Sequence, residues 1–335
     1  MMTVFELIAG LVIILAAAEF FTNGVEWLGI RLGLSEGAVG SVLAAVGTAL
    51  PETMVPVLAI FFGHGEASTH VGIGAILGAP FMLSTLAFFV TGAAAVWFRR
   101  SSRVNGFWRN LQDLKIDRHV MLRDLSYFMV LYTFAIGASL VDGYALKVLI
   151  AVTLVVSYIV YVIRTCQHGE CAVGDDLPSL YLAKGVKEPK LGVILLQVLL
   201  ALLGIVLGAK LFVGGVEAAA AFLGIAPLIL SLIIVPIATE LPEKFNSIIW
   251  VRQGKDTLAM GNITGAMVFQ SSIIPAIGIT STPWKLSWLP VASATLALFS
   301  AALVLITVYR TGRLKPQILM MGGLLYMVFI GLIFA

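Results

Sequence analysis

Two glutamates that directly follow prolines are the residues of this chain best suited to binding a cation. Glu52 and Glu243 both lie within long apolar stretches, and each has a threonine four residues before it, Thr48 and Thr239. A carboxylate in apolar surroundings is costly unless a partner compensates its charge. Hard cations such as Ca²⁺ prefer carboxylate, hydroxyl and carbonyl oxygens as ligands. The repeated Thr-x-x-Pro-Glu pattern therefore predicts a metal-ion site formed by the two glutamates.

The prolines themselves predict that backbone carbonyls are freed beside these carboxylates. Proline lacks an N–H group and interrupts the hydrogen-bond ladder of a helix. We expect each helix to open locally, at Thr48–Glu52 and at Thr239–Glu243. The alternative for a buried glutamate is a protonated side chain bonded to a backbone carbonyl. Finding the same pattern twice favours a shared site, in which two negative charges compensate one divalent ion.

Further polar residues flank the second glutamate. Glu240 either adds charge to the ion site or is protonated beside Glu243, because like charges oppose ionisation. Asn262, Thr264 and Gln270 follow in the next apolar stretch and either line the site or form hydrogen bonds between helices. Glycines that we expect to permit close helix approach near this site are Gly72, Gly74, Gly78, Gly261 and Gly265.

The composition identifies the elements that must position these residues. The chain has 335 residues, of which 60% are hydrophobic and 12% charged, and its mean hydropathy is +1.02. A soluble domain carries about a quarter charged residues. The composition excludes a soluble enzyme, a nucleic-acid-binding protein, a disordered chain and a disulfide scaffold. It predicts a polytopic membrane protein whose surroundings are the lipid bilayer.

Ten stretches are long and apolar enough to span a bilayer, which takes about 20 residues in a helix. They are residues 4–27, 36–62, 70–98, 122–141, 144–163, 190–217, 226–251, 257–279, 286–309 and 316–335. The alternating pattern of membrane β-barrels is absent from the sequence, so we predict an all-α membrane protein with ten transmembrane helices.

Basic residues predict the orientation of these spans. Seventeen lysines and arginines fall in or beside the loops that follow odd-numbered spans, whereas only Lys147 and Lys285 fall in or beside the others. Basic loops stay in the cytoplasm. Both termini are therefore expected on the outer side (N-out/C-out), and the cell membrane is the expected location.

The two halves of the chain repeat each other at an offset of 191 residues, which aligns Leu50-Pro51-Glu52 with Leu241-Pro242-Glu243. We predict a first five-helix repeat over 1–163, a cytoplasmic linker over 164–189 and a second repeat over 190–335. The matching central segments are about 36–85 and 226–272. Because five is odd, the repeats would be inverted, as in many transporters. Glu19 and Lys210 occupy equivalent positions, and we hypothesise that they form an ion pair.

These motifs resemble those of the cation/calcium exchanger superfamily. Gly47-Thr48-Ala49-Leu50-Pro51-Glu52 resembles the first alpha-repeat signature, and Ala238-Thr239-Glu240-Leu241-Pro242-Glu243 resembles the second. Gly261-Asn262-Ile263-Thr264-Gly265 resembles the Gly-Asn-x-x-Gly stretch that follows. The resemblance implies ten helices and antiport of Ca²⁺ against Na⁺, or H⁺ in one branch, by alternating access. It implies Glu52 and Glu243 as central ligands, Thr48 and Thr239 beside them, and carbonyl ligands at Ala45 and Pro236.

The chain also departs from the family pattern. Ala49 and Glu240 stand where the family has serines, and Leu83 and Gln270 stand where it has Asn or Asp. Ala49 and Leu83, both in the first repeat, remove side-chain oxygens expected to hold Na⁺. We therefore predict a Ca²⁺/Na⁺ antiporter and keep an H⁺-driven exchanger of Ca²⁺ or another divalent cation as the alternative.

A cation channel and a non-transporting sensor are further alternatives. An enzyme is not expected, because no catalytic motif lies in a span. We expect no cofactor, inorganic cations as the partners, no nucleic acid, and a monomeric transport unit.

Overall fold

The computed structural model describes residues 2–31, 50–99, 113–167, 178–186 and 188–334, and the regular elements in these ranges are helices. The helices of the first half are α1 (Met2–Arg31), α4 (Leu50–Phe61), α5 (Gly65–Met82), the π-helical turn η2 (Leu83–Ala87), α6 (Phe88–Arg99), α7 (Arg118–Gly137), η3 (Ala138–Leu140) and α8 (Tyr144–Gln167). Those of the second half are η4 (Tyr181–Ala183), α9 (Leu191–Leu223), α10 (Pro227–Arg252), α11 (Asp256–Gln270), α12 (Ile273–Ser281), α13 (Trp288–Thr311) and α14 (Pro316–Ile333).

These helices confirm the prediction of an all-α membrane protein. Within the described ranges, eight helical segments are long and apolar enough to cross a membrane. Two shorter apolar helices, Pro51–Phe61 and Pro227–Glu240, coincide with parts of predicted spans 36–62 and 226–251. Apolar side chains remain exposed along the long helices, as expected for surfaces that face lipid rather than water.

The helices group into two compact units, each of which takes residues from both halves of the chain. The first unit comprises Met1–Gly72 and Ile159–Pro227, and the second comprises Ile73–Tyr158 and Leu228–Ala335. The division therefore falls within helices α5 and α8, which contribute to both units.

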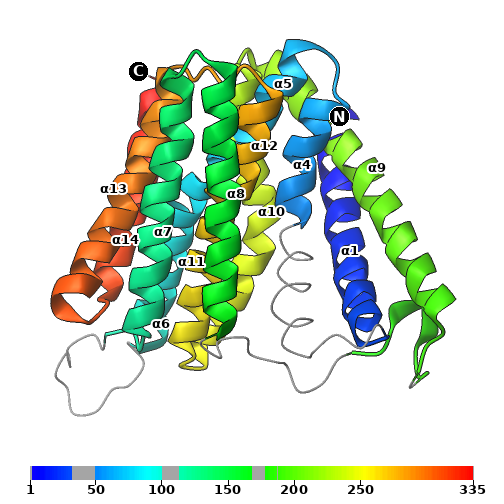
Figure 1. Cartoon of the computed structure of the whole chain (residues 1–335), viewed down its shortest axis with the longest axis horizontal. Coiled ribbons are helices and arrows are strands. Elements are labelled where there is room, and N and C mark those ends of the chain that lie inside the picture. Colours follow the sequence, from blue (N-terminus) through cyan, green and yellow to red (C-terminus); the bar gives the residue numbers. More distant parts are fainter. Residues whose placement is uncertain (1, 32–49, 100–112, 168–177, 187, 335) are drawn as a thin grey trace. The chain divides into compact units, whose positions relative to one another are not determined.

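The first unit is built on the pairing of α1 with α9, which lie side by side (Figure 1). Glycines at the contact allow the two backbones to approach closely. A Cβ atom built on Gly10 would lie 2.6 Å from the Phe212 nitrogen, and one on Gly208 would lie 2.9 Å from the Ile14 nitrogen. Gly24 meets Gln197 at the other end, so the two helices run antiparallel.

This pairing shows that the hypothesised ion pair between Glu19 and Lys210 is wrong. Lys210 lies at the level of Gly10, which is nine residues from Glu19, or about 13 Å at 1.5 Å per residue. Glu19 instead accepts a hydrogen bond from the Tyr181 hydroxyl at 2.6 Å. This bond, together with burial, raises the pKa of Tyr181 above its ordinary value. When two antiparallel helices come from equivalent parts of a repeat, residues at equivalent positions lie side by side only near the centre of the pair.

The end of the predicted linker is held against α1 and α9. Asn23 of α1 accepts hydrogen bonds from the Tyr181 backbone N–H (3.2 Å) and from the Gln197 side chain of α9 (2.9 Å). Gln197 in turn accepts a bond from the Leu182 N–H at 2.9 Å. Asn23 and Gln197 are both buried, and buried polar groups need hydrogen-bond partners. The two side chains meet this need by bonding to each other and to the backbone of residues 178–183, which they hold in place.

In the second unit, α7 packs on α11 and α13, and α14 packs on α6, η2 and α13. The π-helical turn η2 is part of this core: the Ser300 hydroxyl of α13 donates to the Ser84 carbonyl at 2.5 Å. Gly322 of α14 fits directly against the Thr85 backbone. The second unit is thus a helix bundle with a buried irregular turn, a feature that often occurs at functional sites.

We predict that Gly208→Val weakens the α1–α9 pairing. The new side chain would overlap the α1 backbone, and overpacking of this kind costs about 1–3 kcal/mol. The expected result is a lower unfolding temperature in thermal scanning. Gly214→Val is the control, because a Cβ atom on Gly214 of the same helix meets nothing within 4 Å. An equal loss of stability in both variants would contradict the close packing at Gly208.

Candidate functional site

Glu52 is a buried carboxylate near the start of an apolar helix. It is the third residue of α4 and is 6% exposed. Pro51 precedes it within the first turn, where a helix does not need the missing N–H group. Leu50–Glu52 is therefore helical, which is contrary to the expected opening of this stretch. Thr48 and Ala45 lie outside the described residues.

The second predicted opening, at Thr239–Glu243, is also wrong. Helix α10 runs without a break from Pro227 to Arg252 and includes both Pro236 and Pro242. The Thr239 hydroxyl donates to the Val235 carbonyl of the preceding turn at 3.0 Å. A proline can remain in a helix when neighbouring groups accommodate the freed carbonyl, so its presence does not require unwinding.

Glu240 and Glu243 lie on the same helix, α10. Glu240 is 2% exposed, whereas the Glu243 side chain lies outside the description. Residues three positions apart share one face of a helix. The helix therefore places these two acidic positions one turn apart on the same face of α10.

The predicted close approach of helices is confirmed at three glycines. Gly78 of α5 packs against α10, since a Cβ atom there would lie 2.6 Å from Pro236 Cγ. Gly74 packs against the same helix at Ser231, and Gly72 packs against Ile60 of α4. The expectation is wrong for Gly261, where an added Cβ atom would meet nothing within 4 Å. Gly78 also lies against the Leu232 carbonyl. This carbonyl receives no hydrogen bond from residue 236 of its own helix, because Pro236 has no N–H group.

Polar side chains of α11 have two distinct environments. Gln270 is 3% exposed, and its Oε1 atom has no hydrogen-bond partner among the described residues. Asn262 is partly exposed. A buried amide oxygen of this kind is chemically suited to a cation, and Gln270 thus remains a candidate ligand. Its position at the last residue of α11 places it next to the turn into α12.

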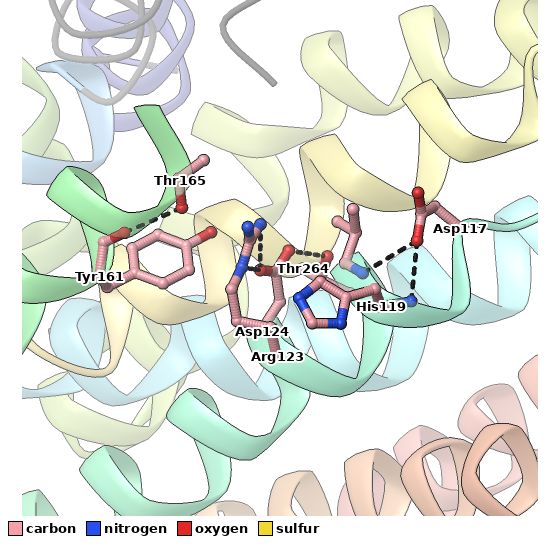
Figure 2. A network of polar contacts seen from close by, with 8 residues as sticks. Asp117, His119, Arg123, Asp124, Tyr161, Thr165 and Thr264 are labelled. Atoms are coloured by element: carbon pink, nitrogen blue, oxygen red, sulfur yellow. Dashed lines mark hydrogen bonds and ion pairs between the residues drawn. The ribbon is translucent and has the colours of Figure 1, made fainter. Parts of the chain in front are cut away.

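A buried ionic network connects α7 to α11 (Figure 2). Asp124 is 1% exposed and forms an ion pair with Arg123 at 3.0 Å. The other Asp124 oxygen accepts a hydrogen bond from Thr264 at 2.7 Å. Thr264 lies between Asn262 and Gly265, so the network holds the motif-bearing segment of α11 in place. The sequence reasoning missed Asp124, although an acidic residue within predicted span 122–141 was available as a signal.

The predicted site residues that the structure describes fall in both units. Pro236, Thr239 and Glu240 lie along α10 in the second unit, and Glu52 lies in the first unit. Within the part of the chain that the structure describes, no cluster of three His, Cys, Asp or Glu side chains is arranged to hold a metal ion. A shared site between Glu52 and Glu243 stays a prediction.

The sequence matches a known protein family over nearly its whole length. The family described as sodium/calcium exchanger protein matches residues 2–166 and 193–335. The chain is similar to the putative antiporter CaxA of Alkalimonas amylolytica, with 25% identity over 98% of this chain and 96% of the relative. It is also similar to the sodium/calcium exchanger MaX1 of Methanosarcina acetivorans, with 23% identity over 96% of both chains.

Solved structures share the fold at lower sequence identity. An H⁺/Ca²⁺ exchanger, CAX, superimposes with a TM-score of 0.73 at 15% identity over 98% of this chain and 81% of that one. The sodium-calcium exchanger NCX_Mj superimposes with a TM-score of 0.55 at 20% identity over 99% of both chains.

We predict that removing Asp124 destabilises the second unit. In Asp124→Leu, the 12%-exposed Arg123 side chain loses its ion pair with Asp124, and breaking a buried ion pair in this way costs about 3–5 kcal/mol. Thr264→Val removes one hydrogen bond and should cost about 1 kcal/mol. Thermal unfolding measures both effects, and Thr133→Val, at an exposed position of α7, serves as the control. Wild-type stability of Asp124→Leu would show that the network does not hold the helices together.

Proposed function

Because this chain belongs to the sodium/calcium exchanger protein family, we propose that it is a secondary active antiporter that exchanges Ca²⁺ for Na⁺ by alternating access. The family match and the names of two relatives, an antiporter and a sodium/calcium exchanger, support this proposal. We place the protein in the cell membrane with both termini outside. Its ten spans form two inverted repeats, 1–163 and 190–335, joined by the linker 164–189, and the monomer is the transport unit.

The observation that carries the proposal is the burial of acidic side chains in apolar helices. Glu52 of α4 and Glu240 of α10 are both almost fully buried. A carboxylate in a membrane segment is expensive and normally marks an ion pathway or a proton relay. Glu52 and Glu243 are the central ligands in this proposal, with Thr48, Thr239 and the carbonyls of Ala45 and Pro236 beside them.

The same charges explain how two ion fluxes are coupled. An empty site carries uncompensated negative charge, and this charge opposes the passage through an occluded, water-poor intermediate. Binding of Ca²⁺ or of counter-ions neutralises the site and permits the switch between inward-facing and outward-facing states. Exchange follows because the protein crosses between the two states only when loaded. No bond is made or broken, so the activity is transport rather than enzymatic catalysis.

A second candidate is an exchanger of Ca²⁺, or another divalent cation, driven by H⁺. Leu83, at the position where the family has Asn or Asp, is fully buried in η2 and offers no side-chain oxygen for Na⁺. Glu240 stands where the family has serine, and a carboxylate can take up and release a proton whereas a serine cannot. Compared with the family pattern, the chain therefore has fewer ligands for Na⁺ at Leu83 and one additional proton-binding group at Glu240.

We predict that proteoliposomes containing this protein accumulate ⁴⁵Ca²⁺ when an imposed Na⁺ gradient drives the exchange. Uptake that requires Na⁺ and ignores a pH gradient would support Na⁺ coupling. Uptake driven by a pH gradient in the absence of Na⁺ would support the H⁺-driven candidate. Protein-free liposomes provide the background, and uptake equal to that background under both gradients would refute calcium exchange.

We predict that Glu52→Gln and Glu243→Gln each abolish calcium exchange, since either change removes half of the negative charge that compensates the ion. The control is Glu66→Gln, an exposed position at the start of α5 that should retain wild-type flux. Glu240→Gln tests the H⁺-driven candidate, in which it would remove the dependence of flux on pH. Substantial ⁴⁵Ca²⁺ flux in Glu52→Gln, with normal amounts of folded protein, would refute its role as a ligand.

A further inference from the structure

A purely apolar groove lies between α8 and α12 in the second unit. It has a volume of about 390 Å³, and its walls include Ala151 and Val155 of α8 and Ile273 and Ala276 of α12. The single polar residue of the lining is Thr280, whose hydroxyl donates to the Ala276 carbonyl of its own helix at 2.9 Å. The groove therefore offers no free hydrogen-bonding group, and only an apolar occupant suits it.

An aromatic pair lies beyond one end of the groove, and a buried lysine lies beyond the other. Tyr158 and Phe269 meet edge to face, with ring centroids 5.5 Å apart, beyond the Val155 end of the groove. Beyond the Ala151 end, the Lys147 ammonium donates to the Pro283 carbonyl at 2.6 Å. Lys285 lies two residues farther along and is exposed. The groove thus runs from an aromatic wall to a pair of lysines.

These lysines are unusual in this sequence. Among the lysines and arginines of the sequence, Lys147 and Lys285 alone lie in or beside the loops that follow the predicted even-numbered spans. Asp142 lies in the turn that precedes α8, five residues before Lys147. Lys147 is 7% exposed and keeps two further N–H groups besides the one bonded to Pro283. A phosphate group has the charge and the acceptor oxygens to complement this end.

We propose that the groove between α8 and α12 binds one membrane phospholipid. One acyl chain lies along the groove from Ala151 toward Tyr158, and the phosphate lies beside Lys147 and Lys285. The groove opens to the bilayer, since Val152 and Val156 on its rim are 52% and 51% exposed. Lipid tails are as apolar as the groove, so burial alone does not select this site over the general lipid layer. Selectivity comes from the fit of the chain and from the lysines, which attract anionic lipid.

The acyl-chain part of the proposal is tested by filling the groove. Val155→Trp places a large ring between α8 and α12, and Val328→Trp is the matched control at a 45%-exposed position of α14. Native mass spectrometry of the detergent-purified protein, titrated with phosphatidylglycerol, counts the lipids retained. We expect one tightly retained lipid in the wild type and in Val328→Trp, and its loss in Val155→Trp. Equal retention in all three proteins would overturn the proposal.

The headgroup part is tested at Lys285, whose side chain is exposed and is not required for packing. Lys285→Glu should weaken retention of the first phosphatidylglycerol by at least roughly fivefold, the equivalent of one lysine contact near a lipid surface. Lys184→Glu makes the same charge change in the linker and should leave retention unchanged. An equal effect of both variants would show general electrostatic attraction and overturn the site.

The same mass spectra test the competing occupant, a second copy of the chain. A dimer in the wild type that becomes monomeric in Val155→Trp would assign the groove to protein contact and overturn the lipid proposal. Calcium flux is not part of this readout, so failure of the lipid proposal leaves the proposed exchange activity unaffected.

Discussion

The cost of placing a carboxylate in a membrane-spanning helix is the constraint on which the structure depends. Glu52 and Glu240 are almost fully buried in a chain that carries little charge elsewhere in its spans. Such groups are tolerated where they bind ions, exchange protons or contact partners. Because burying a carboxylate is costly, the acidic residues in α4 and α10 are the basis of the ion site that we propose.

Close helix packing is how the fold holds them. Glycines of α5 let α10 approach at Leu232 and Pro236, one turn before Thr239 and Glu240. In the first unit, glycines join α1 to α9 in the same way. Membrane helices lack a hydrophobic drive to associate with each other, so small residues at the contact supply the van der Waals packing instead. The glycine content of the chain is thus tied directly to the placement of the acidic positions.

Polar side chains then fix particular pairs of helices. Asp124 satisfies Arg123 and Thr264 at once and holds α7 to α11, while Asn23 and Gln197 hold residues 178–183 to α1 and α9. Buried networks of this kind are stable only when every member has a partner, and they therefore specify one arrangement of helices. The residues named in these two networks lie outside the Leu-Pro-Glu motifs.

The sequence alone determined the class of protein, eight of the ten predicted spans and the family, because hydropathy and the two Leu-Pro-Glu motifs are local features of the chain. It also identified Gly74 and Gly78 as contact residues, since only glycine permits such close approach. Only the tertiary structure decided the contacts that depend on register: Glu19 bonds Tyr181 rather than Lys210, because α1 and α9 are antiparallel. It likewise decided that α10 continues through its prolines, since the surroundings that accommodate a freed carbonyl are not encoded in any local pattern.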